Sequence, residues 1–211
     1  MNWNKHSNLE GSHAFLSASK YGWLGKTDDE LLQSYTNSFA TTIGTLLHSY
    51  AADSIRYCEN LRKSDARGVK FDLMRRGVPE FAIDIPAVFP TLMSYVNDAI
   101  GFRMDPEVVL YYSDMCYGTA DSIQYSRSHD NYILRIHDLK TGTTPAKMEQ
   151  LLIYAALFYL EYGYKPDNTK TELRIYQMDE IVVHEPEPDE IREVMSAIVS
   201  KDRVLQKIKE V

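Results

Sequence analysis

The N-terminal half of the chain repeats apolar residues at intervals of three and four, a pattern typical of amphipathic helices. One such face lies between about residues 38 and 61 and consists of Ile43, Leu46, Leu47, Tyr50, Ala51 and Ile55. A capping box from Thr27 to Glu30, with acids in its first turn, predicts the start of another helix. Shorter helices are expected in two further segments, residues 16–24 with Ser17 as the N-cap and residues 90–102. Residues 65–79 are basic and predict a loop, with or without a short helix.

Beyond Pro106 the pattern changes to short runs of β-branched and aromatic residues, which is typical of strands. Five strands are expected, at residues 107–112, 118–125, 132–139, 171–177 and 180–184. The polar segment 126–131 has the composition of a turn, so the first three strands should form an antiparallel meander. Pro145 is expected to open an apolar helix over residues 146–162, and Gly163 is expected to end it.

Together with a final helix over residues 187–211, these elements predict one domain of the α/β class with a mixed α+β layout. The predicted core runs in the order helix, three-strand meander, helix, strand. A helical N-terminal part would span about residues 1–105, and the sheet would span about residues 106–185.

Composition narrows the class of protein. Hydrophobic residues make up 44% and charged residues 25% of 211 positions, as in ordinary soluble proteins, which excludes disorder as the main state. No run approaches the ~18–20 apolar residues of a membrane span, so no membrane partner is expected. The polar first ten residues lack a signal peptide, and two cysteines fit a reducing compartment, so a cytoplasmic location is expected.

The net charge of −7 argues against a passive coat for nucleic acid, which needs a basic face. An enzyme that acts on nucleic acid remains possible, because carboxylates gathered around a metal make a site acidic until the metal binds. One basic stretch stands out, formed by Lys63, Arg67, Lys70, Arg75 and Arg76. It could grip phosphates, or it could be a solvated helix face or loop.

The strongest candidate chemistry lies at the end of the third expected strand. Asp138 and Lys140 alternate along it and therefore point to the same side. In a meander, Asp121 on the preceding strand can converge with Asp138. Two carboxylates and a lysine at one end of a sheet suit a hard cation such as Mg²⁺ or Mn²⁺. Each residue alone would more often be a surface ion pair or a turn acid.

Two helical pairs accompany these residues. Gln150 and Tyr154 lie one turn apart on the helix that follows, and Gly44 and His48 lie one turn apart on the long N-terminal helix. A glycine inside a helix costs about 1 kcal/mol relative to alanine, so Gly44 suggests close approach of another backbone. Taken singly, these side chains could equally lie at the border of a hydrophobic core without any role in chemistry.

In this order the motifs resemble those of the PD-(D/E)XK nuclease superfamily, specifically its RecB-like branch, which includes phage exonucleases and CRISPR-adaptation nucleases. The similar segments are Gly44 with His48, Gly118 with Asp121, Asp138 through Gly142, and Gln150 with Tyr154. The opening Leu16-Ser17-Ala18-Ser19 is also similar to many phage members. The resemblance implies a restriction-endonuclease-like core, in the element order expected above.

The same resemblance implies hydrolysis of DNA phosphodiester bonds with Mg²⁺ or Mn²⁺, most often by an exonuclease acting in recombination, repair or degradation. His48, Asp121, Asp138 and the backbone carbonyl of Leu139 would bind the metal, and the histidine would slightly favour Mn²⁺. Lys140 would orient the attacking water or stabilise phosphoryl charge, while Gln150 and Tyr154 would position the strand. Glu107, on the first expected strand, either contributes to the same site or is only a charged residue at a strand edge.

Two departures limit the resemblance. Members with an iron–sulfur cluster use four cysteines, whereas this chain has only Cys58 and Cys116, so no cluster is expected. No phosphate-binding Gly-x-x-x-x-Gly-Lys-Ser/Thr motif is present, so no ATP is expected.

Expected partners are DNA, as single strands or duplex ends, and a second copy or a recombination protein. Four alternatives stay open: a catalytically silent DNA-binding or scaffold protein on the same fold, an endonuclease, a nuclease acting on RNA, and an unrelated interaction domain.

Overall fold

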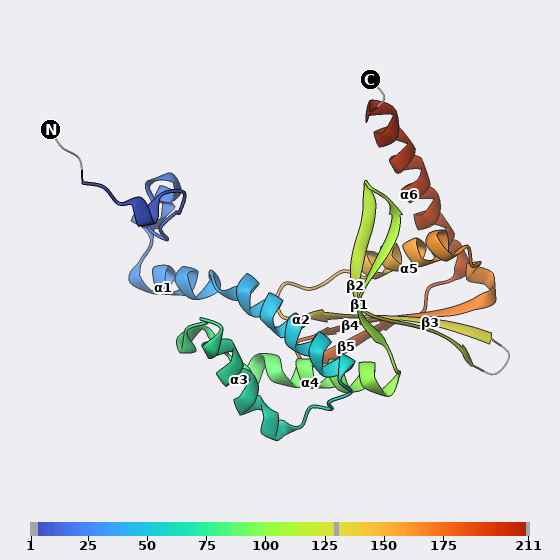
Figure 1. Cartoon of the computed structure of the whole chain (residues 1–211), viewed down its shortest axis with the longest axis horizontal. Coiled ribbons are helices and arrows are strands. Elements are labelled where there is room, and N and C mark those ends of the chain that lie inside the picture. The colour runs from blue at the N-terminus through green and yellow to red at the C-terminus, as the bar shows by residue number, and fades with distance from the viewer. Residues whose placement is uncertain (1–3, 129–130, 210–211) are drawn as a thin grey trace.

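The computed structural model describes residues 4–128 and 131–209, which form a five-stranded mixed sheet and six α-helices (Figure 1). The prediction of a mixed α/β class is therefore confirmed. Among the described helices, none is both long enough and apolar enough to cross a membrane.

The strands lie in chain order across the sheet: β1 (Asp105–Ser113), β2 (Cys116–Ser128), β3 (Asn131–Lys140), β4 (Thr169–Gln177) and β5 (Glu180–His184). Neighbouring strands are antiparallel except β3 and β4, which are parallel. A parallel pair needs a crossover, and α5 (Glu149–Tyr162) supplies it. All five expected strands are present. His129 and Asp130 of the expected turn lie outside the described residues.

Helices cover the two faces of the sheet and divide the core. On one face, α5 and α6 (Pro188–Lys209) pack on strand residues such as Leu134 and Ile136. On the other face, α2 (Ala40–Arg56) and α4 (Ile85–Gly101) pack on Leu139 and Tyr176. β3 therefore sends Leu139 to the α2–α4 side, and alternation sends Asp138 and Lys140 to the opposite side.

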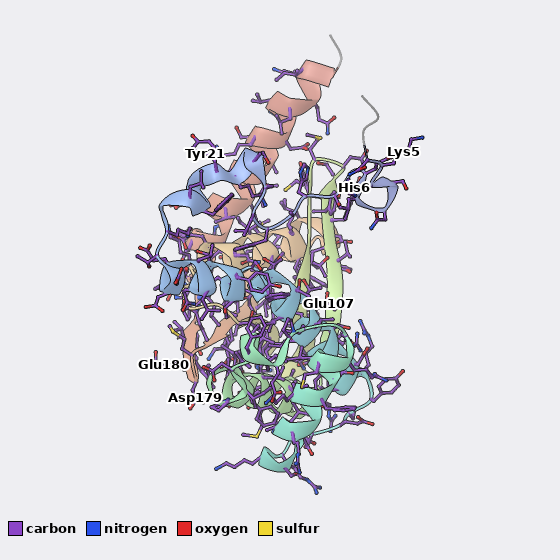
Figure 2. The ribbon with its side chains drawn as sticks, turned by 90° about the vertical axis from the view of Figure 1, so that its left-hand side faces the viewer. Lys5, His6, Tyr21, Glu107, Asp179 and Glu180 are labelled. Atoms are coloured by element: carbon purple, nitrogen blue, oxygen red, sulfur yellow. The ribbon has the colours of Figure 1, made fainter. Side chains whose placement is uncertain are left out.

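The N-terminal arm, residues 4–38, extends away from the sheet (Figure 1). It contains two 3₁₀ helices, Ser7–Leu9 and Ala18–Gly25, and α1 (Asp28–Asn37). The predicted capping box is confirmed, because Thr27 and Glu30 each accept a hydrogen bond from the other's backbone N–H. Among the described residues, none before Leu47 is buried. Tyr21, labelled in Figure 2, is 73% exposed.

Several predicted boundaries are wrong, and the causes are mostly local. The helix expected to Leu61 ends at Arg56, and α4 begins five residues before Pro90, where the Asp84 carboxylate accepts a hydrogen bond from Ala87 N–H. The short helix near residue 17 is a 3₁₀ helix, and the Ser17 side chain makes no capping hydrogen bond there.

The basic stretch is also more ordered than a loop. It contains α3 (Ala66–Arg75), whose Val69 and Leu73 are buried one turn apart against the α2–α4 core. Apolar residues at this four-residue spacing mark the inward side of a helix.

Pro145 does not open the helix after β3, which begins only at Glu149. The Gln177 side chain at the end of β4 holds the segment before α5 in a bent, non-helical path. Its amide donates to the carbonyls of Gly142 and Thr144, and its oxygen accepts from Ala146 N–H. The predicted end of α5 is confirmed, because Gly163 adopts φ +69° as the C-cap.

Candidate functional site

The hydrogen-bond ladder between β2 and β3 stops at the pair Ser122–His137. The next residues along each strand, Asp121 and Asp138, therefore face one another where the strands part. The Asp121 carboxylate accepts a hydrogen bond of 2.8 Å from Leu139 N–H, which replaces the missing strand partner. The two acids that the sequence singled out are thus brought together at the end of the sheet.

Asp138 is 1% exposed, and the Lys140 ammonium contacts both of its carboxylate oxygens, at 3.1 Å and 2.9 Å. The same ammonium donates to Gln150 Oε1 at 2.8 Å, and Gln150 Nε2 donates to the Tyr154 hydroxyl at 3.1 Å. Four of the sequence-predicted residues therefore form one connected chain from Asp138 to Tyr154. α5 holds the lysine through this chain.

Two glycines make room for the site. A Cβ on Gly118 would lie 2.8 Å from the ring of Tyr154, so only glycine lets α5 come this close to β2. A Cβ on Gly44 would lie 3.0 Å from Thr141 Oγ1. The expected close approach at Gly44 is therefore to a side chain rather than to a backbone.

His48 projects from α2 toward the same place. Its Nδ1 lies 3.4 Å from Asp121 Oδ2. Burial alone would lower the pKa of the imidazole, but the hydrogen bond to Asp121 and the charges of Asp121, Asp138 and Glu107 outweigh burial and raise it. An imidazole surrounded by carboxylates is suited to share a cation with them.

Glu107 joins this group from β1. The β1–β2 register places it across from Asp121, between the pairs Pro106–Ser122 and Val108–Ala120. One potential ligand atom each from His48, Glu107 and Asp121 lies within 4.8 Å of the others. Burial and the neighbouring Asp121 charge raise the pKa of the Glu107 carboxyl. Figure 2 labels Glu107 at the base of the β1–β2 hairpin.

Asp138 is the most perturbed acid of the site. Burial and the Asp121 charge raise the pKa of its carboxyl to about 6, against the opposing effects of Lys140 and His48. Its buried Oδ2 atom makes no hydrogen bond but lies 2.9 Å from the Lys140 ammonium, so the two groups form an ion pair. A divalent cation between Asp138 and Asp121 would further offset the repulsion between the two carboxylates.

A cleft of about 630 Å³ opens beside these residues, between α2 and the β1–β2 hairpin. His48, Glu107 and Asp121 line it, together with Thr119 and Arg56. The cleft gives a ligand access from solvent to the carboxylates of Glu107 and Asp121, whereas Asp138 is buried behind its lining.

Three of the five cations of the basic stretch around α3 are paired with carboxylates. Arg75 and Arg76 both bind the Asp72 carboxylate, at 3.0 Å and 2.9 Å, and Lys70 binds Glu80 at 2.6 Å. Two of these pairs are three and four residues apart on one helix, so the spacing of Asp72 could have revealed them from sequence.

His137 was not singled out from the sequence. Its ring is fully buried on the α2–α4 side, between Phe102 and Tyr176, directly behind the two carboxylates. Burial and the charges of Arg174 and Arg135 lower the pKa of its imidazole to about 3. The only signal in the sequence is its place one residue before Asp138, where alternation sends it to the opposite face.

In comparisons with known proteins, no family model matches this chain and no curated protein matches it at a significant level.

Proposed function

We propose that this protein is a divalent-metal-dependent DNA nuclease of the RecB-like PD-(D/E)XK type, most consistent with an exonuclease. The observation that carries the proposal is the convergence of Asp121, Asp138 and Lys140 where β2 and β3 part, with His48 beside them. The order helix, three antiparallel strands, helix and parallel strand supports a restriction-endonuclease-like core.

The donor set fits Mg²⁺ or Mn²⁺. Asp121 and Asp138 supply hard carboxylate oxygens, and a cation between them would offset the charge of Asp121 that raises the pKa of Asp138. The Leu139 side chain is buried in the opposite core, so its backbone is the part of this residue beside the site. When bound, such a metal would lower the pKa of a water molecule and offset charge on the phosphate.

The chain's own residues have separate roles in this proposal. The Lys140 ammonium is a compact charge that would orient the attacking water or stabilise phosphoryl oxygens. Gln150 holds that ammonium in place, and Tyr154 holds Gln150, so both act as positioning residues. His48 would contribute a nitrogen ligand from α2.

The test is a cleavage time course with wild type, Asp138→Asn and the matched exposed variant Asp189→Asn. Substrates are end-labelled single-stranded, linear duplex and closed circular DNA, each with Mg²⁺, Mn²⁺ or EDTA. We expect metal-dependent loss of the linear substrates by wild type and Asp189→Asn only, with the circle spared. Cutting of the circle would make the enzyme an endonuclease. Absence of cleavage under every condition would overturn the proposal in favour of a silent DNA-binding protein.

A further inference from the structure

The β1–β2 hairpin carries one face of side chains that begins in the cleft and continues outward. On β1, Glu107, Val109 and Tyr111 are exposed, whereas Leu110 between them is buried on the α5 side. On β2, the same face carries Asp121, Thr119 and Tyr117. We call these six residues the hairpin strip. Its first rung, Glu107 and Asp121, belongs to the candidate metal group.

The outer rung of the strip is a pair of tyrosines. Tyr111 lies directly across from Tyr117, and their rings are stacked with centroids 6.5 Å apart and an angle of 24°. The two side chains are 45% and 64% exposed, and Val109 beside them is 55% exposed. The hairpin rises from the sheet (Figure 1), and the exposed fractions of these side chains place the aromatic surface in solvent.

The two rungs are four residues apart along each strand. At a rise of about 3.3 Å per residue, this places the tyrosines about 13 Å from the acids. Four stacked nucleotides, at about 3.4 Å each, span the same length. A strand that stacks on the tyrosines can therefore reach the carboxylates along the strip.

The surroundings of the tyrosines favour bases over phosphates. The Tyr111 hydroxyl donates to Asp114 and its backbone N–H donates to Glu161, so the nearest charges repel a phosphate. Around α3, Lys70 is engaged by Glu80, and Arg75 and Arg76 are engaged by Asp72, while the net charge of the chain is −7. Binding to this strip must therefore come mainly from contact with apolar surface.

We propose that the hairpin strip is a base-stacking subsite that receives the unpaired end of a single-stranded DNA and leads it to Glu107 and Asp121 in the cleft. Unpaired bases offer flat faces that stack on tyrosine, whereas bases inside a duplex are already stacked on one another. The proposal rests on the nuclease function above and adds the form of its substrate.

The test measures binding in EDTA, so that it does not depend on cleavage. The probes are a fluorescent oligothymidylate and an abasic strand of equal length, which has the same phosphates without bases. The variants are Tyr111→Thr with Tyr117→Thr, which keeps β-forming residues, and the double Tyr→Phe exchange, which keeps the rings. Tyr57→Thr, at another exposed tyrosine, is the control.

We expect wild type to prefer oligothymidylate over the abasic strand by at least about fivefold, the equivalent of about 1 kcal/mol for one stacked base. The double threonine variant should lose this preference, and the double phenylalanine variant and Tyr57→Thr should keep it. Equal binding of both probes by wild type, or an unchanged preference in the threonine variant, would overturn the subsite.

A second readout separates this proposal from the nuclease function. Hydrolysis of bis(p-nitrophenyl) phosphate requires the metal site but no nucleotide chain. We expect equal rates for wild type and the double threonine variant on this small diester. If wild type hydrolyses neither the small diester nor DNA, the proposed nuclease function is wrong. The binding measurement in EDTA then still tests whether the hairpin strip binds bases.

Discussion

At the scale of single residues, the most consequential group is the Asp138 carboxyl. Burial and Asp121 raise its pKa to about 6 from an ordinary 3.8. The folded state therefore keeps a proton that the unfolded state releases between those pH values. The stability associated with this group is present below about pH 4 and is lost as the pH rises to about 6.

Asp138→Asn should therefore stabilise the metal-free protein while abolishing the proposed nuclease activity. In EDTA at pH 7 we expect the free energy of unfolding to rise by up to about 3 kcal/mol, because no buried charge remains. Below about pH 4 the two proteins should be equally stable. Urea titrations at both pH values measure the change in the free energy of unfolding. A variant that is less stable than wild type at pH 7 would contradict the prediction.

His48 should matter less than the carboxylates. We expect His48→Ala to lower DNA cleavage by about 10–100-fold, because water can replace one nitrogen ligand, and Asp121→Asn to lower it further. The asparagine oxygen can keep the hydrogen bond from Leu139 N–H, so this variant mainly removes the charge of a proposed metal ligand. Cleavage rates at saturating Mn²⁺ test this order. Equal losses of cleavage in the two variants would mean that His48 is as important to the reaction as the carboxylate.

At the scale of elements, the site depends on how closely α5 approaches β2. The Tyr154 ring packs on Gly118, and Tyr154 in turn supports Gln150 and Lys140. The position of the lysine is thereby set by a contact between a helix and a strand that are far apart in the chain.

Gly118→Ala should disturb this contact, since its Cβ would lie 2.8 Å from the Tyr154 ring. We expect a loss of stability of about 1–3 kcal/mol and slower DNA cleavage. Adding Tyr154→Ala should cost less in the Gly118→Ala background than in wild type, which a double-mutant cycle of unfolding energies measures. Gly68→Ala in α3 is the control, because nothing lies within 4 Å there, and additive costs would contradict the contact.

At the scale of the whole molecule, the protein consists of a packed sheet with its helices and an N-terminal arm with little core of its own. Contacts within the arm and its base are mainly aromatic, for example Phe15 with Tyr35 and Tyr35 with Phe81. Stability should therefore reside in the segment from α2 onward.

Removing residues 1–25 should leave the free energy of unfolding within about 1 kcal/mol of the full chain, because the main loss is the aromatic pair of Phe15 with Tyr35. The shortened chain keeps Thr27 and the cap of α1. Urea unfolding of both chains, with their m-values, is the measurement. A deletion through α2, which removes the buried Leu47, should prevent folding. A large loss of stability from the deletion of residues 1–25 would contradict the inference that stability resides in the segment from α2 onward.

Local spacing determined much of this protein. Apolar periodicity predicted α2 and α6, runs of β-branched and aromatic residues predicted the five strands, and alternation placed Asp138 and Lys140 on one side of β3. The one-turn spacing of Gln150 and Tyr154 likewise predicted their shared face. These relations follow from the periods of 2.0 residues in a strand and 3.6 residues in a helix, which do not depend on where the element lies in the fold.

Tertiary structure decided which side chains from different helices and strands come into contact. The predicted start of α5 was wrong because Gln177, at the end of β4, holds the segment before it. The place of Glu107 opposite Asp121, the contact of Gly118 with Tyr154 and the burial of Asp138 all depend on strand register and helix packing. A register forms only when many distant residues pair and pack at once, so no short segment of sequence contains it.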